Sequence, residues 1–97
     1  VLIRAIEPLH GLEIMAERRG LADPRALCSG PGKLCQAMAV TREHDGLPLD
    51  KAPFELREGA ARALIAGPRI GITKAADTPW RFGEAGSRYL SRPFPTP

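Results

Sequence analysis

The amino-acid sequence predicts a single domain of the mixed α+β class, and two kinds of apolar spacing lead to this prediction. Between residues 9 and 16, apolar residues recur at intervals of three and four positions, which is the spacing of an amphipathic helix. Over residues 53–57 and 69–74, apolar residues instead alternate with others, as in strands that bury one face. At 97 residues the chain is one small domain or part of one, with room for a modest core.

The chain opens with a segment that we expect to be a buried strand, residues 1–5, because its first three residues are apolar. Arg4 interrupts this strand. An arginine in a buried strand needs a partner, and Glu7 is the nearest candidate for an internal ion pair. The amphipathic helix follows, and we expect it to end at Gly20, since glycine readily adopts the left-handed conformation that ends helices.

A tight Ser-Gly-Pro-Gly turn at residues 29–32 leads into a second short helix. Ser29 or Gly30 is its expected N-cap, and Pro31 occupies the first turn, where a missing N–H costs nothing. Lys33 stands near the first free amides of this helix, so a phosphate or a carboxylate could bind there. An ordinary capped helix with a solvated lysine is the alternative interpretation of the same residues.

The apolar side of the second helix is expected to be buried and comprises Leu34, Cys35 and Met38. Six residues separate Cys28 from Cys35, which is neither the spacing of zinc ligands nor that of a redox pair, so we expect both thiols to be reduced. His10 and His44 have no cysteine or carboxylate partners at metal-ligand spacing. We therefore expect no metal site.

The second half of the chain begins with a polar loop over residues 41–53 and carries both alternating segments. Gly71 lies inside the second of them, and a glycine weakens a strand unless something must approach its backbone closely; a bulge is the alternative. The stretch 60–66 is rich in small residues and leaves helix and strand open. Trp80 and Phe82 are expected in the core, because they too sit in an alternating strand.

Charge is distributed unevenly along the chain. The net charge is +3, but residues 1–60 hold eight Lys and Arg against nine Asp and Glu, whereas residues 61–97 hold six against two. Arginines in such a basic region suit phosphate contact, and solubility is the other explanation. No apolar run is long enough to span a bilayer, and we expect neither membrane attachment nor secretion. Because the chain does not begin with Met, we expect a fragment of a longer product.

Three blocks of sequence, in the same order, resemble the alkyladenine DNA glycosylase family, also called 3-methyladenine DNA glycosylases. They are VLIRAIEPLHGLE at residues 1–13, LCSGPGKLCQAM at residues 27–38, and RIGI at residues 69–72 followed by PWRF at residues 79–82. The resemblance implies that residues 1–92 are the C-terminal half of such a domain, a curved and mostly antiparallel sheet packed with helices. Residues 93–97 are expected to form an extended tail.

The resemblance also implies roles for single residues. Lys33 matches a residue that contacts a DNA backbone phosphate, and the residues of the turn before it and of the later strand lie against the nucleic acid. The DNA-binding residues so implied are Ser29, Gly30, Lys33, Ile70 and Gly71. Arg4 matches an arginine beside the base-binding pocket, where it would support the catalytic carboxylate.

The family's reaction is hydrolysis of the N-glycosidic bond of an alkylated or deaminated purine, of the 3-methyladenine or hypoxanthine type, flipped out of double-stranded DNA. The resemblance implies no cofactor, a monomer, and a location with the DNA: cytoplasmic at the nucleoid in a bacterium, nuclear in a eukaryote. It places the catalytic glutamate in the other half of the family's domain. We therefore expect no catalytic residue in this chain and no activity from the chain alone.

Two other classes of function explain parts of the same sequence. A DNA-binding module without chemistry accounts for Lys33, Gly71 and the basic C-terminal region, and predicts salt-sensitive binding that ignores damage. A structural or interaction domain accounts for the apolar pattern alone. It predicts that replacing Lys33 has no effect on DNA binding.

Overall fold

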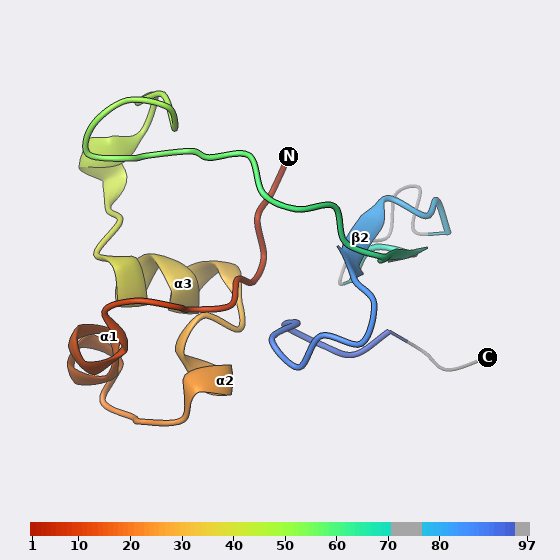
Figure 1. Cartoon of the computed structure of the whole chain (residues 1–97), viewed down its shortest axis with the longest axis horizontal. Helices are drawn as coiled ribbons and strands as arrows, with labels where there is room; N and C mark the ends of the chain where they lie inside the picture. Colours follow the sequence, from red (N-terminus) through yellow and green to blue (C-terminus); the bar gives the residue numbers. More distant parts are fainter. Residues whose placement is uncertain (71–76, 95–97) are drawn as a thin grey trace.

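The computed structural model describes residues 1–70 and 77–94, and these form a helical part and a hairpin part (Figure 1). The helical part holds α1 (Leu12–Arg19), α2 (Pro24–Leu27), α3 (Pro31–Met38) and the short 3-10 helix η1 (Arg42–His44). The hairpin part holds β1 (Leu64–Gly67) and β2 (Arg81–Glu84). The predicted α+β class is confirmed, with a two-stranded antiparallel sheet in the described residues.

The three α-helices pack against one another around a small core. Leu27, Cys28 and Ala37 are almost completely buried. The partly buried side chains around them are Ile6, Leu12, Met15, Ala16, Leu21 and Leu34. Gly20 ends α1 as predicted, with a left-handed φ of 72° and its N–H donating to the Ala16 carbonyl at 2.8 Å.

Two arginines at the end of α1 join the helices. Arg18 donates from Nη1 to the Ala37 carbonyl at 2.9 Å. Arg19 donates to the carbonyls of Leu27 and Ala26 at 3.1 and 3.2 Å. Carbonyls at the end of a helix have no partner within that helix, so these guanidinium groups satisfy acceptors that would otherwise depend on water.

Met38 is not buried as predicted. Its side chain is 41% exposed, whereas Ala37 is fully buried. Ala37 follows Leu34 by three positions and Met38 follows it by four, so the two flank Leu34 on opposite sides of α3, and the side that carries Ala37 is the buried one.

Both cysteine thiols are free, as predicted. Cys28 is buried in the core with its Sγ 4.0 Å from the Met15 sulfur, and Cys35 is half-buried on α3. Burial raises the pKa of the Cys28 thiol, and the positive charge of Arg19 opposes this shift. Cys28 is therefore a packing residue and not a reactive thiolate at neutral pH.

The prediction of a buried strand at residues 1–5 is wrong. The segment is extended, but Val1, Leu2 and Ile3 are exposed. A strand exists only where another pairs with it, and within the described ranges residues 1–5 make no backbone–backbone hydrogen bond. The first such bond is that of the next residue, from the Ile6 N–H to the Cys28 carbonyl at 3.2 Å. The Arg4–Glu7 ion pair is also absent from the ion pairs of the described residues.

The first strand of the hairpin lies earlier in the sequence than the strand predicted for residues 69–74. β1 pairs antiparallel with β2, with Leu64 opposite Glu84 and Gly67 opposite Arg81. Pro68 follows β1 directly, and proline cannot donate to a ladder, so the strand ends before the predicted segment 69–74 begins. Residues 69 and 70 are not in a strand, and 71–74 lie outside the described residues. The open stretch 60–66 thus supplies most of β1.

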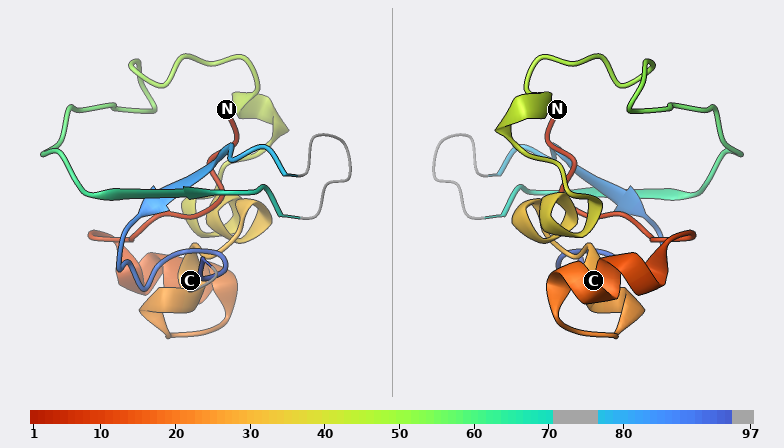
Figure 2. Two further views of the ribbon diagram at one scale, coloured as in Figure 1. Left: turned by 90° about the vertical axis from the view of Figure 1, so that its right-hand side faces the viewer. Right: turned by 90° about the vertical axis from the view of Figure 1, so that its left-hand side faces the viewer.

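The strand predicted for residues 53–57 does not form either. These residues belong to the long connection between η1 and β1, which has no neighbouring strand to pair with (Figure 2). Leu56 is 68% exposed. Phe54 is half-buried because its ring meets the His44 ring edge to face, with 5.6 Å between ring centroids.

Trp80 and Phe82 are not core residues: they are 60% and 66% exposed. Side chains alternate across a strand, so Phe82 points away from the face that carries Gly83. The face that carries Gly83 is covered by Phe94, a residue of the predicted extended tail. Its ring lies so close that a Cβ on Gly83 would stand 2.9 Å from Phe94 Cε2. Glycine at this position therefore makes room for the ring.

Candidate nucleic-acid interface

Four segments that are distant in sequence meet at a groove of about 400 Å³. They are the N-terminal segment, the turn that begins α3, the chain after β1, and the residues that follow the hairpin. The lining residues are Arg4, Ser29, Gly30, Pro31, Gly32, Lys33, Ile70, Ser91 and Arg92. The groove brings together Arg4 and four of the five residues predicted to bind DNA, while Gly71 lies outside the described residues.

The α3 side of the groove consists of the turn and its lysine. Gly30 is the N-cap and provides no side-chain hydrogen bond to the first turn. Ser29 instead directs its hydroxyl to the Ala26 carbonyl at 3.5 Å. The amides at the start of α3 thus have no side-chain acceptor, and the helix dipole adds partial positive charge there.

Lys33 extends back over this turn. A Cβ built on Gly30 would lie 3.6 Å from Lys33 Cδ, so the aliphatic part of the lysine covers the glycine. The side chain is exposed. Its ammonium group therefore belongs to the same surface as the first amides of α3, an arrangement that favours an anionic oxygen ligand.

Arg4 lines the groove from the N-terminal segment. The residue is half-buried, and its Nε is a buried donor with no hydrogen-bond partner within the described ranges. A buried N–H without an acceptor costs about 1–3 kcal/mol, so a ligand oxygen at this place would be stabilised. Arg4 also lines a second cleft, described below, and so faces both.

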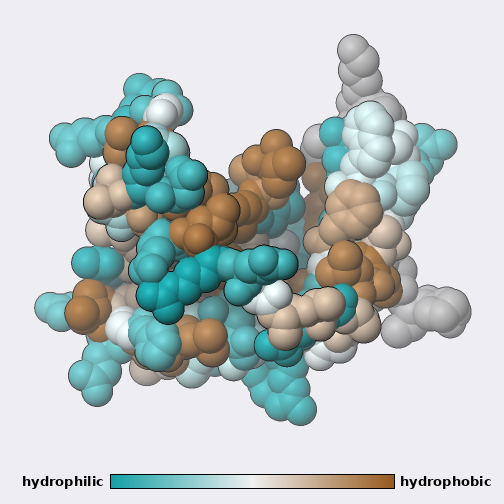
Figure 3. All heavy atoms as spheres, turned by 45° about the horizontal axis from the view of Figure 1, so that its top comes forward, coloured by the Kyte–Doolittle hydropathy of each residue, from teal (hydrophilic) through white to brown (hydrophobic). Residues whose placement is uncertain are grey.

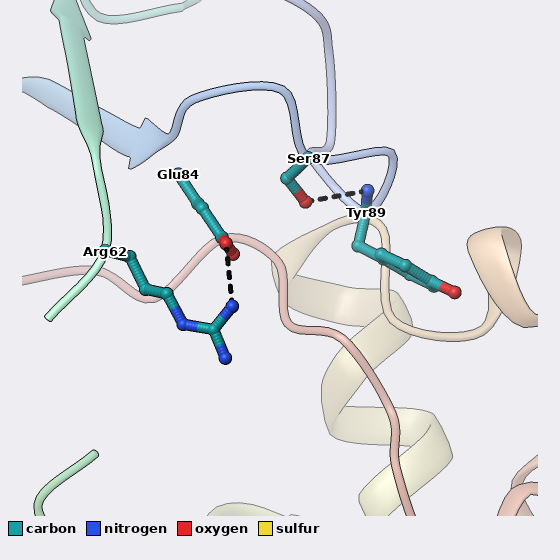
Figure 4. A network of polar contacts seen from close by, with 4 residues as sticks. All are labelled: Arg62, Glu84, Ser87 and Tyr89. Carbon is teal, nitrogen blue, oxygen red and sulfur yellow. Dashed lines mark hydrogen bonds and ion pairs between the residues drawn. The ribbon is translucent and has the colours of Figure 1, made fainter. Parts of the chain in front are cut away.

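Sequence reasoning missed the wall formed by Ser91 and Arg92. Two polar contacts lie at the end of the hairpin and in the chain that follows it: Arg62 Nη1 lies 3.4 Å from a Glu84 carboxylate oxygen, and the Tyr89 N–H donates to Ser87 Oγ at 3.1 Å (Figure 4). For Arg92 the signal in the sequence was the basic excess of residues 61–97, which named no residue. Ser91 matches a serine that recurs in the alkyladenine DNA glycosylase family, which the sequence resembles.

The charged side chains that line the groove are cationic: Arg4, Lys33 and Arg92. No Asp or Glu is among the described residues that line it. Burial lowers the pKa of the nearby Arg81, and the positive charges of Arg4 and Arg92 lower it further. Like charges held this close repel one another, and an anion in the groove would reduce that repulsion.

A second and wider cleft, of about 830 Å³, adjoins the groove. Residues 1–7 form one side and Trp80–Glu84 the other. The exposed side chains of Val1, Leu2 and Ile3 contribute to an apolar surface between the helical part and the hairpin part (Figure 3).

No metal cluster and no membrane-spanning helix is present in the part of the chain that the structure describes. No group of three or more His, Cys, Asp or Glu side chains there could hold a metal ion. None of the helices there is both long and apolar enough to cross a bilayer.

The fold and the groove define an α+β protein with a cationic surface suited to phosphate. The sequence pattern of the methylpurine-DNA glycosylase family matches residues 1–88, and the chain belongs to this family. A protein of Rhodopseudomonas palustris (strain ATCC BAA-98 / CGA009) named "Putative 3-methyladenine DNA glycosylase" is 64% identical over 96 residues, covering 98% of this chain and 47% of that protein. One of the same name from Nitrosospira multiformis is 58% identical over 98 residues, covering 100% and 51%. The resemblance drawn from the three blocks is confirmed, and the chain spans about half the length of these relatives.

Proposed function

We propose that this chain is the DNA-gripping half of a glycosylase that excises alkylated or deaminated purines, of the 3-methyladenine or hypoxanthine type, from double-stranded DNA. The observation that carries the proposal is the groove: Lys33, the free amides of α3 and Arg4 converge from separate segments on one cationic surface. Membership of the methylpurine-DNA glycosylase family supports the reaction class. Residues 1–92 would form this half of the domain.

The groove would hold the sugar-phosphate backbone of one strand. Lys33 and the first amides of α3 present donors to phosphate oxygens, and such contacts fix the position of a protein on DNA without reading its sequence. Ile70 and Gly71 would lie against the same strand. The binding energy of these backbone contacts would offset the cost of unstacking and unpairing a nucleotide when it is rotated out of the duplex.

Chemistry would follow once the base is extruded. Damaged bases unpair more easily, which contributes selectivity, and a cationic alkylated base leaves readily. A carboxylate from the other half of the domain would activate water, with Arg4 as a supporting residue beside it; the groove's lining contains no carboxylate of its own. The reaction needs no metal or organic cofactor, and we propose that the protein works as a monomer. The two relatives named above are bacterial, and in a bacterium the protein would work at the nucleoid.

A second candidate is a DNA-binding module without chemistry. The absence of Asp and Glu from the lining of the groove favours it, because backbone binding needs only cations and amides. This candidate predicts equal affinity for damaged and undamaged duplexes.

Excision of hypoxanthine from a labelled duplex tests the proposal. We expect the 97-residue chain to release no base, and a form extended upstream to the length of the relatives to release it. In the extended form, Lys33→Ala should weaken duplex binding by roughly tenfold, since one phosphate contact is lost. Lys51→Ala is the matched control, because Lys51 is exposed and lies outside the groove.

The possible results separate the candidates. Release of hypoxanthine by the 97-residue chain would overturn the division between a gripping half and a catalytic half. Binding without excision by both forms would favour the module without chemistry. Equal binding by the Lys33 and Lys51 variants would remove the groove from the proposal.

A further inference from the structure

We propose that residues 90–94, here called the C-terminal strap, form the second wall of the DNA groove, with Arg92 binding a backbone phosphate and Arg81 positioning it. The proposal rests on the proposed function of the groove. The strap itself follows residue 88, where the match to the family's sequence pattern ends, and Arg81 lies within that match.

The strap is fixed to the hairpin by the Phe94 ring. Arg81 is the first residue of β2, and its Cζ lies 3.9 Å from the centroid of this ring, a cation–π contact. Two glycines leave the space that the ring occupies: a Cβ on Gly67 would stand 3.2 Å from Phe94 Cδ1, and one on Gly83 would stand 2.9 Å from Phe94 Cε2. The Phe94 ring thus occupies a space that side chains at positions 67 and 83 would fill.

Arg81 holds the strap at a second point, because its Nη2 donates to the Arg92 carbonyl. One guanidinium group therefore contacts the backbone of Arg92 and the ring of Phe94. Both contacts use the planar shape of the group, which a lysine cannot reproduce. Fixing the backbone at Arg92 sets where its side chain begins.

The side chain of Arg92 belongs to the groove. Arg92 and Ser91 line it together with Lys33 and Gly30, although about 60 residues separate the two pairs in the sequence. Arg92 is exposed, so it can meet a ligand without rearrangement of the core. A phosphodiester between Lys33 and Arg92 would have donors on two sides.

Arg81 and Arg92 are in neither of the ion pairs Arg57–Glu55 and Arg62–Glu84, which join described residues. Positive charges held close together without a carboxylate repel one another, and a bound anion would reduce this repulsion. The ligand class that fits is a phosphodiester.

Duplex binding measured over a series of salt concentrations tests the proposal. Arg92→Ala in the protein should lower affinity roughly tenfold and reduce the slope of log K against log salt by about one. Arg88→Ala is the matched control: Arg88 is exposed, carries the same charge four residues earlier, and lines neither the groove nor the wider cleft. Its slope should be unchanged.

A double-variant cycle tests the positioning role of Arg81. Arg81→Lys keeps the positive charge but loses the planar contacts, so we expect it to weaken binding by most of the loss seen for Arg92→Ala. Combined with Arg92→Ala it should cause little further loss, because both changes remove the same phosphate contact. Additive losses would show that Arg81 contacts DNA itself and would overturn its positioning role. Circular dichroism of each variant separates misfolding from lost contact.

Lys33→Ala distinguishes this proposal from the proposed function. A reduced slope for Lys33→Ala together with an unchanged slope for Arg92→Ala would overturn the strap and leave the groove in place. Unchanged slopes for both would overturn the groove and the strap together. Reduced slopes for both, with Arg88→Ala unchanged, support a groove with two walls.

Discussion

At the scale of single residues, Gly83 shows how a glycine in a strand can make room for an aromatic ring. A Cβ at this position would lie 2.9 Å from Phe94 Cε2 and 3.0 Å from Leu90 Cδ2. Gly83→Ala should therefore destabilise the protein by about 1–3 kcal/mol through overpacking, with a lower midpoint in urea unfolding.

Gly59→Ala is the control for that substitution. A Cβ on Gly59 would meet nothing within 4 Å, so this change should have almost no effect on the urea midpoint. Equal midpoints for the two variants would mean that Phe94 and Leu90 do not pack over Gly83. Gly83→Ala should also weaken duplex binding if the strap is a wall of the groove, because the ring that anchors Arg92 would move.

At the scale of elements, the junction of α1, α2 and α3 depends on Arg19. Its guanidinium donates to two carbonyls at the end of α2 and to Gln36 Oε1 on α3 at 3.1 Å. Arg19→Ala leaves partly buried carbonyls without donors, so we expect a loss of about 1–3 kcal/mol in the free energy of unfolding. Thermal unfolding followed by the helical circular dichroism signal measures this loss.

Arg25→Ala is the comparison for this element. Arg25 is exposed, and its side chain makes no hydrogen bond or ion pair with another described residue, so its removal should change the unfolding midpoint little. If the two variants unfolded at the same temperature, Arg19 would be a solvated residue and the helices would be joined by apolar packing alone.

The elements also show what local sequence can predict. The end of α1 at Gly20 and the turn before α3 follow from interactions within a few residues, and both were predicted correctly. Of the predicted strands, the alternating segment that carries Phe82 forms β2. Residues 1–5 and 53–57 have the right composition but no partner strand among the described residues, because pairing depends on which segments meet. Pro68 was the local sign that β1 had to end before the predicted strand.

The candidate site follows the same division. Gly30, Lys33 and Arg4 were predicted from motifs and resemblance, and the fold brings them to one groove. Arg92 could not be predicted, because its place depends on Phe94 filling the space above two glycines in a hairpin whose strands were unknown. Trp80 was misplaced for a related reason: alternation shows that two faces exist, but not which one is covered.

At the scale of the whole molecule, the wider cleft gathers exposed apolar side chains from two distant segments on one surface. Its sides carry Leu2 and Ile3 on one segment and Trp80 on the other, and Trp80 is the chain's single tryptophan. The relatives are about twice as long as this chain. We therefore expect Trp80 fluorescence to shift to shorter wavelength, and acrylamide quenching to fall, when the chain is extended upstream to their length. The reason is that burial against added polypeptide removes water from the indole. Leu56→Trp in a Trp80→Phe background is the control, because Leu56 is exposed and lies outside this cleft. Its fluorescence and its quenching by acrylamide should be the same in both lengths of the chain. If Trp80 were quenched equally in both forms, the cleft would remain open in the longer protein, and the apolar surface would need another explanation.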